Sequence, residues 1–258
     1  MEIRYAVSLW NFYHYTTSPT LEGVVKEVSS KGYGLELWPW YDEEKNLYSR
    51  SYRERLKQIV KGVEISLHSG DVRTFAEHQT QIDTASYIGG KVIVVHPDNL
   101  FSDYNNPDYT LAQDIVDYAK KERVTIALEN GPLEILEKAI ENVKGLKICL
   151  DIGHIYATEH SLGDFLDSLK EHLVHLHLQD YIKIPDMFDH VTCGTGLISQ
   201  DDWHLFFNTL KEINYRGIAV FEIRPRPPMV EIDQAVNFLK KKLDRVTKNV
   251  IQIGSRTL

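Results

Sequence analysis

The stretch "LKICLDIGH", residues 146–154, decides how the rest of the sequence is interpreted. An apolar run ends abruptly at Asp151, and His154 follows three residues later. Burying a carboxylate is costly unless the group is paired or binds a metal. An acid at the end of a strand-like segment therefore predicts a functional position, and other strand-like segments of the chain end in a similar way.

Eight short runs rich in Val, Ile and Leu recur along the chain, as expected of strands that are buried on both faces. They alternate with segments of helical periodicity at intervals of roughly thirty residues, the size of one βα unit. This alternation predicts an α/β protein with a single (β/α)8 TIM-barrel domain over residues 1–258. A doubly wound open sheet is the alternative, but no GxGxxG motif follows the first run. The runs are residues 3–9, 33–38, 63–68, 91–96, 124–129, 146–151, 173–178 and 218–223.

Composition narrows the class of protein. The formal net charge of −8 and the pI of about 5.8 argue against binding to the phosphate backbone of nucleic acids. Cys149 and Cys193 form no CxxC pair, which favours a reducing, cytoplasmic environment without structural disulfides. The start, "MEIRYAVSLWNFYHY", has no long apolar run, so we expect neither a signal peptide nor a membrane span. A homo-oligomer is compatible with the sequence.

Ionisable residues lie at or near the C-terminal ends of seven of the eight runs. In a barrel these ends surround one mouth, where the active sites of this fold lie. Any one of these residues alone has a plainer interpretation as a hydrogen-bonded rim residue. Together, carboxylates and imidazoles that converge on one mouth predict a divalent metal ion, with Mn, Zn, Co and Mg all compatible. The residues are Glu36, His68, His96, Glu129, Asp151, His175, His177 and Glu222.

The sequence resembles the xylose-isomerase-like TIM barrels, a superfamily of sugar and sugar-phosphate isomerases and epimerases that also includes endonuclease IV. The resemblance covers essentially the whole chain and rests on seven motifs in the family's order. No single motif is specific, and the set indicates the superfamily rather than the substrate. The motifs are "SLHSG", "VVHPD", "IALEN", "LDIGH", "HLHLQD", "DHVTCGTGLIS" and "YRGIAVFEIRP".

The resemblance to the single-metal sugar epimerases implies that Glu129, Asp151, His177 and Glu222 hold one divalent ion. His177 is preferred to His175 because the family pattern is His-x-x-Asp, which here ends at Asp180. Glu129 and Glu222 are then the catalytic pair that moves a proton. Three further positions are implied to contact substrate, although Lys183 also fits a solvated loop and Arg224 a rim ion pair. They are His154, Lys183 and Arg224.

Endonuclease IV offers an alternative with up to three zinc ions, and most of its liganding positions have a counterpart here. Endonuclease IV has an Asp-x-His motif, and this chain departs from it because Phe188, instead of an aspartate, lies two residues before His190. In family members that are not nucleases, residues like His68 and His96 line the pocket instead of binding metal. The further possible ligands are His68, His96, His154 and His190.

Aromatic residues near the predicted mouth favour a sugar-sized ligand, because the apolar CH faces of sugars stack on such rings. Trp10 follows the first run, Trp38 ends the second, and Trp40 lies two residues further on. We therefore expect Trp10, Trp38 and Glu36 to contact a small-molecule sugar substrate. The leading hypothesis is a metal-dependent sugar isomerase or epimerase that transfers a proton through a glutamate. The alternatives are a zinc phosphodiesterase, a related dehydratase or lyase, and a non-catalytic sugar-binding barrel.

Overall fold

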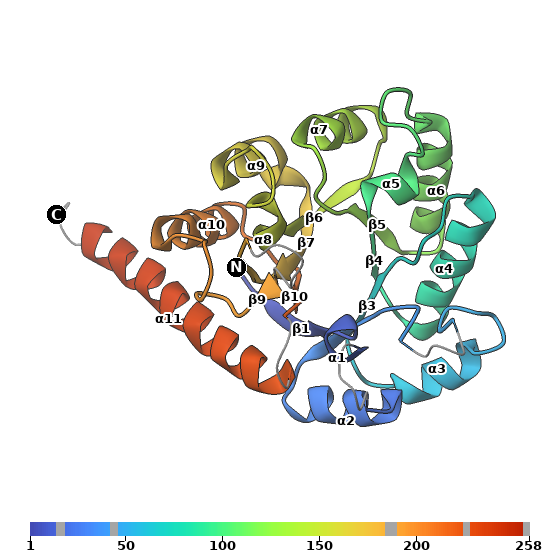
Figure 1. Cartoon of the computed structure of the whole chain (residues 1–258), viewed down its shortest axis with the longest axis horizontal. Coiled ribbons are helices and arrows are strands. Elements are labelled where there is room, and N and C mark those ends of the chain that lie inside the picture. Colours follow the sequence, from blue (N-terminus) through green and yellow to red (C-terminus); the bar gives the residue numbers. More distant parts are fainter. Residues whose placement is uncertain (14–18, 42–45, 184–189, 224–227, 255–258) are drawn as a thin grey trace.

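The computed structural model describes residues 1–13, 19–41, 46–183, 190–223 and 228–254. Eight parallel strands close into a barrel in the order β1-β10-β7-β6-β5-β4-β3-β2, with helices around the outside (Figure 1). The predicted (β/α)8 fold is confirmed, and the open-sheet alternative is wrong because β1 pairs with β10. The barrel strands are β1 (Arg4–Ser8), β2 (Gly34–Leu37), β3 (Ile65–His68), β4 (Val92–Val95), β5 (Thr125–Leu128), β6 (Lys147–Asp151), β7 (Leu173–Leu178) and β10 (Ile218–Phe221).

The helices lie between successive strands and pack their apolar faces onto the barrel (Figure 1). The last of them, α11 (Pro228–Gly254), extends past the ring of helices toward the C-terminus (Figure 1). No described helix is long and apolar enough to cross a membrane. The remaining helices are α1 (Trp10–Tyr13), α2 (Leu21–Ser30), α3 (Arg53–Ile59), α4 (Phe75–Ile88), α5 (Pro97–Leu100), α6 (Tyr109–Lys121), α7 (Leu133–Asn142), α8 (Ile152–Ile155), α9 (Leu162–Leu169), η1 (Lys170–His172) and α10 (Gln200–Glu212).

Apolar residues fill the space between strands and helices, whereas the inside of the barrel is packed by small clusters. One inner cluster contains Ala6, Ile218 and Val220, and another contains Val94, Ala127 and Cys149. Above these residues the barrel interior becomes polar toward the C-terminal ends of the strands. A separate antiparallel pair, β8 (Asp180–Tyr181) with β9 (His190–Val191), lies after β7 and was not predicted.

Strand register sets the height of the polar residues at the mouth. His177 on β7 pairs with Asp151 on the neighbouring strand β6 and with Val220 on the other neighbouring strand, β10. The backbone N–H of Glu129 donates to the carbonyl of Val95 (2.9 Å), which continues the β4–β5 ladder by one residue. These pairings bring side chains from successive strands to one level of the barrel.

Candidate metal centre

Four acidic and imidazole side chains meet at the C-terminal mouth of the barrel. Glu129 directly follows β5, Asp151 ends β6, His177 lies in β7, and Glu222 directly follows β10. One potential ligand atom from each lies within 4.8 Å of the others, and all four residues are buried. The Nδ1 atom of His177 is 3.0 Å from a Glu129 oxygen, 3.4 Å from a Glu222 oxygen and 4.0 Å from an Asp151 oxygen.

The composition of this group fits a divalent cation. Three buried carboxylates face one imidazole nitrogen, which has at most one proton to share among them. Buried charges of one sign need a partner of the opposite sign, and oxygen ligands with one imidazole suit Mg, Mn, Co or Zn. The four residues predicted from the sequence are therefore placed where they could hold one ion together.

Glu129 is the most connected carboxylate of the mouth. Its Oε2 atom lies 2.9 Å from Nε2 of His96 and 3.2 Å from Nε2 of His68, and its Oε1 atom faces His177 and His154. Burial alone would raise the pKa of Glu129, but the charges of His177 and His96 outweigh burial and hold that pKa well below its usual range. Glu129 is therefore ionised in this arrangement.

The further predicted ligands also come together around this group. His68, His96 and Glu129 have ligand atoms within 4.8 Å of one another, and so do Asp151, His154 and His190. Burial lowers the pKa of His154, but Asp151 and Glu129 offset burial and raise it to about 10. Each of these two groups shares a carboxylate with the first, and a further candidate group, His68–His177–Glu222, shares two residues with it.

Asp151 is held by three residues that fix both its backbone and its side chain. The Gln179 amide donates to both carboxylate oxygens of Asp151, at 3.0 and 2.8 Å. The Asn130 side chain accepts from the Asp151 N–H at 2.9 Å and donates to the Asp151 carbonyl at 2.5 Å. The His154 N–H donates to Asp151 Oδ1, because Asp151 is the N-cap of α8. Sequence reasoning missed Asn130 and Gln179, although each lies within two residues of a predicted ligand.

Glu36 lies beneath the mouth, and its contact with substrate stays a prediction. Its side chain is fully buried and accepts hydrogen bonds from Ser66 (3.0 Å) and His175 (2.9 Å). Its other oxygen lies 3.1 Å from Nε2 of His177, although the two are not aligned as a hydrogen bond. His177 thus turns Nε2 toward Glu36 and Nδ1 toward the carboxylates of the candidate metal centre.

A cavity of about 230 Å³ opens above these residues. Trp10, Trp38, His68, His96 and His154 line it, as expected of residues that contact a substrate, together with Glu129, Glu222 and His190. Lys183 is exposed and does not line the cavity, and Arg224 lies outside the described residues. The Trp10 and His190 rings are 5.0 Å apart, so His190 contributes to the wall as well as to a candidate ligand group.

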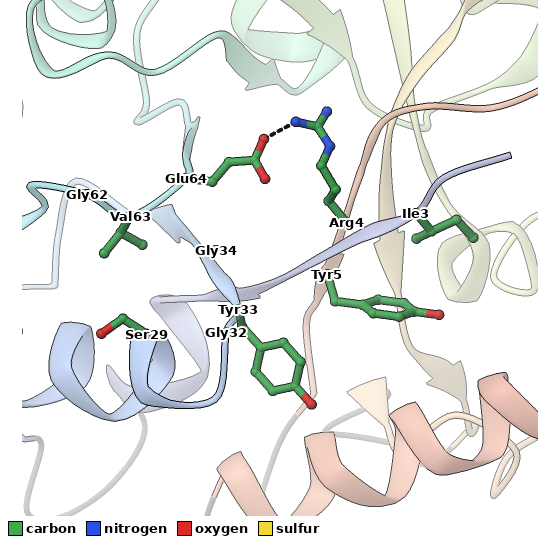
Figure 2. A pocket seen from close by; sticks show the side chains of 10 residues that line it. All are labelled: Ile3, Arg4, Tyr5, Ser29, Gly32, Tyr33, Gly34, Gly62, Val63 and Glu64. Atoms are coloured by element: carbon green, nitrogen blue, oxygen red, sulfur yellow. Dashed lines mark hydrogen bonds and ion pairs between the residues drawn. The ribbon is translucent and has the colours of Figure 1, made fainter.

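A larger hollow of about 400 Å³ lies at the opposite end of the barrel, where strands β1 and β2 begin. Figure 2 shows the Arg4–Glu64 ion pair among the lining residues, with the rings of Tyr5 and Tyr33 pointing away from the ion pair. None of the candidate ligands lines it. In this fold the N-terminal end serves stability and the C-terminal end carries the active site, so size alone does not mark the functional cavity.

The family profile described as "Xylose isomerase-like TIM barrel" matches residues 30–242. The chain belongs to the xylose isomerase-like TIM barrel family. An uncharacterized protein of Methanocaldococcus jannaschii is 27% identical over 208 residues, which span 75% of this chain and 72% of the relative.

Solved structures share the fold of this xylose isomerase-like barrel. An L-ribulose 3-epimerase superimposes with a TM-score of 0.74 at 14% identity, covering 100% of both chains. The IOLI protein with a bound zinc atom gives a TM-score of 0.68 at 18% identity, covering 95% of this chain and 98% of that one. At these identities the likeness establishes the fold alone.

Proposed function

We propose that this protein is a divalent-metal-dependent isomerase or epimerase of a sugar or sugar derivative. The observation that carries the proposal is the buried group of Glu129, Asp151, His177 and Glu222 at the base of a cavity walled by Trp10 and Trp38. An L-ribulose 3-epimerase and a zinc-binding protein with this fold support the same assignment.

Two glutamates give the cavity a means of moving a proton. Glu129 and Glu222 both line it, and they enter from strands separated in the barrel by β6 and β7. A bound divalent ion supplies Lewis-acid polarisation of a carbonyl and an adjacent hydroxyl. One glutamate in the ionised form removes a proton from the carbon next to the carbonyl, and the other returns a proton to that carbon or its neighbour. Trp10 and Trp38 hold the sugar against this pair and exclude water from part of it.

Metal content tests the ligand assignment directly. Asp151→Ala removes a carboxylate from the group, so we expect the purified variant to lose bound metal in elemental analysis while its circular dichroism spectrum is retained. The matched control is Asp114→Ala, which removes an exposed carboxylate from α6 and should leave metal content unchanged. Unchanged metal content in Asp151→Ala would refute the assignment.

Solvent exchange tests the glutamate relay. With a ketose found by substrate screening, turnover in deuterium oxide should place deuterium at the reacting carbon, because a proton on a carboxylate exchanges with solvent. Glu129→Gln and Glu222→Gln should each remove nearly all turnover. Product that forms without deuterium after many turnovers would replace the relay with a hydride shift between carbons.

A zinc phosphodiesterase is the second candidate function, and one observation favours it. Within each of the groups His68–His96–Glu129 and Asp151–His154–His190, the potential ligand atoms lie within 4.8 Å of one another. Elemental analysis separates the two functions, because the phosphodiesterase requires three zinc ions per chain and the isomerase requires one. His68→Ala and His96→Ala should each keep a single-ion site intact, and loss of that ion would favour the multinuclear site.

A further inference from the structure

Asn11 is a fully buried polar residue that has no role in the chemistry described above. It lies in α1, directly after Trp10 of the cavity wall. Burying a side-chain amide costs free energy unless its polar atoms are hydrogen-bonded. The partners of this amide therefore indicate what it does.

Both partners of Asn11 are backbone groups on either side of Glu222. The Asn11 Nδ2 atom donates to the carbonyl of Phe221 at 2.8 Å, and Oδ1 accepts from the N–H of Ile223 at 3.0 Å. The pairing of β1 with β10 ends where Val7 faces Phe221, so Glu222 lies just past the paired part of the strand. The Asn11 amide therefore holds β10 at the point where the backbone of β1 no longer does.

Glu222 depends on its backbone more than the other two carboxylates of the candidate metal centre do. The Gln179 amide donates to both oxygens of Asp151, and His177 is hydrogen-bonded to Glu129 at 3.0 Å. Among the residues that the structure describes, none makes a hydrogen bond to the Glu222 carboxylate, and its ion-pair partner there is Nδ1 of His177 at 3.4 Å. The position of this carboxylate is therefore set mainly by the backbone that carries it.

The short helix α1 is itself fixed to the barrel. The N–H of Leu9 donates to the carbonyl of Glu36 at 2.8 Å, and the N–H of Phe12 donates to the carbonyl of Leu9 at 3.1 Å. Leu9 and Phe12 are both buried in the apolar core. A side chain can position another residue only where packing fixes the side chain itself. Asn11 meets this condition.

We propose that Asn11 is a positioning residue that holds Glu222 in place for metal binding and proton transfer. This inference rests on the proposed function and adds a residue to it. Asn11 does not line the cavity, and it acts through the backbone on both sides of Glu222. Because Trp10 is its neighbour in α1, one helix supplies both a wall of the cavity and the support of a ligand.

Zinc affinity in a double-mutant cycle tests the inference. Asn11→Leu has the same branching as the native side chain and removes both hydrogen bonds. We expect the dissociation constant for zinc, measured by competition with a chelator, to rise about tenfold or more, within the range found for residues that support metal ligands. In a Glu222→Ala background the same substitution should have no further effect, because Asn11 acts through Glu222. A residue that only stabilised the fold would weaken zinc binding by the same factor in both backgrounds.

The matched control removes a buried hydrogen bond from the opposite end of β10. The Tyr215 hydroxyl donates to the carbonyl of Ile218, the first residue of the strand, at 2.8 Å. Tyr215→Phe should therefore leave zinc affinity unchanged. If circular dichroism shows that Asn11→Leu does not fold, Asn11→Ala takes its place, because a water molecule in the polar space left behind can satisfy the two backbone groups without fixing them.

The outcomes separate this inference from the proposed function. The inference alone is overturned if Glu222→Ala weakens zinc binding but the Asn11 variant does not, or if the Asn11 variant weakens it equally in both backgrounds. Failure of both Asn11 variants to fold assigns the residue to the fold and also overturns the inference. Unchanged zinc affinity in Glu222→Ala instead contradicts the proposed ligand set, and the inference falls with it.

Discussion

Gly153 shows how closely the residues around Asp151 are packed. A Cβ atom at this position would lie 2.6 Å from Cγ and 2.7 Å from Cδ of Gln179, whose side chain is fully buried. Gln179 is the residue whose amide contacts both oxygens of Asp151. The glycine in "LDIGH" is therefore required by the side chain that positions the neighbouring acid.

We expect Gly153→Ala to weaken metal binding without removing a ligand. The added methyl group displaces Gln179, and Asp151 then loses the amide donor that fixes its carboxylate. The dissociation constant, measured by competition with a chelator, should rise by about tenfold or more, within the range found for residues that support metal ligands. Gly163→Ala is the control, because a Cβ at Gly163 meets its nearest atoms at 3.5 Å or more. Equal metal affinity in Gly153→Ala and the wild type would show that Gln179 is not needed.

At the residue scale, the sequence was sufficient to place the residues that end strands. Glu129, Asp151, His177 and Glu222 are among the ionisable residues that interrupt or end an apolar run, and the family resemblance selected these four from the larger set. The depth of Glu36 could not be predicted, because it depends on register: Glu36 is paired with Ser66, two residues before the end of β3. The sequence pattern of a strand shows on which face of the sheet a residue lies. It does not show the level of that residue along the barrel axis, which depends on strand register.

Asp180 determines the shape of the segment that follows β7. Its carboxylate accepts from the N–H groups of Tyr181 (2.9 Å), Gly194 (2.9 Å) and Ile198 (3.0 Å), and the residue is fully buried. One side chain thus joins β8 to the turn that follows β9. This arrangement keeps β9, and with it His190, against Trp10 at the wall of the cavity.

We expect Asp180→Ala to loosen this segment while the barrel stays folded. Three backbone N–H groups lose their acceptor, so amide hydrogen exchange of residues 190–198 should become faster, and exchange in β5 and β6 should remain unchanged. Asp201→Ala, an exposed acid in the first turn of α10, is the matched control. If exchange in residues 190–198 is the same in both variants, Asp180 does not hold the segment.

At the element scale, the eight barrel strands were predicted because each is a compact apolar run. The β8–β9 pair was not predicted, because its strands have two residues each and its paired residues are nine and eleven positions apart in the chain. Such a pair is stabilised by long-range contacts such as those of Asp180, which have no periodic signature. The sequence pattern therefore describes the barrel better than the segments above its mouth.

Stability and chemistry are supplied by different parts of the whole molecule. The apolar core lies between strands and helices, and Trp203 on α10 is fully buried within it. Its ring contacts those of Phe206, Phe207 and Phe238, at centroid distances of 6.1, 6.2 and 5.5 Å. None of these residues lines the metal cavity.

We expect Trp203→Ala to lower the free energy of unfolding by about 3–5 kcal/mol, the cost of truncating a buried aromatic side chain. Urea denaturation measures this change, and metal affinity under native conditions should stay near that of the wild type. Trp203→Phe should cost much less, because Trp203 Nε1 is buried and has no hydrogen-bond partner among the described residues. A loss of metal affinity as large as that of Asp151→Ala would show that the core and the mouth are not independent.

Asn130 and Gly131 are each fixed by a separate packing requirement. The Asn130 amide contacts both the N–H and the carbonyl of Asp151, and a Cβ on Gly131 would lie 2.8 Å from Cγ of Pro97. Asparagine followed by glycine is the dipeptide most prone to spontaneous deamidation, because the unhindered glycine nitrogen attacks the side-chain amide carbon and releases ammonia. The aspartate or isoaspartate that forms would bring a negative charge to the Asp151 carbonyl, where an N–H had donated. Chemical ageing of the stored protein is therefore expected to begin beside Asp151, and it proceeds slowly only while the folded mouth holds the Asn130 side chain in place.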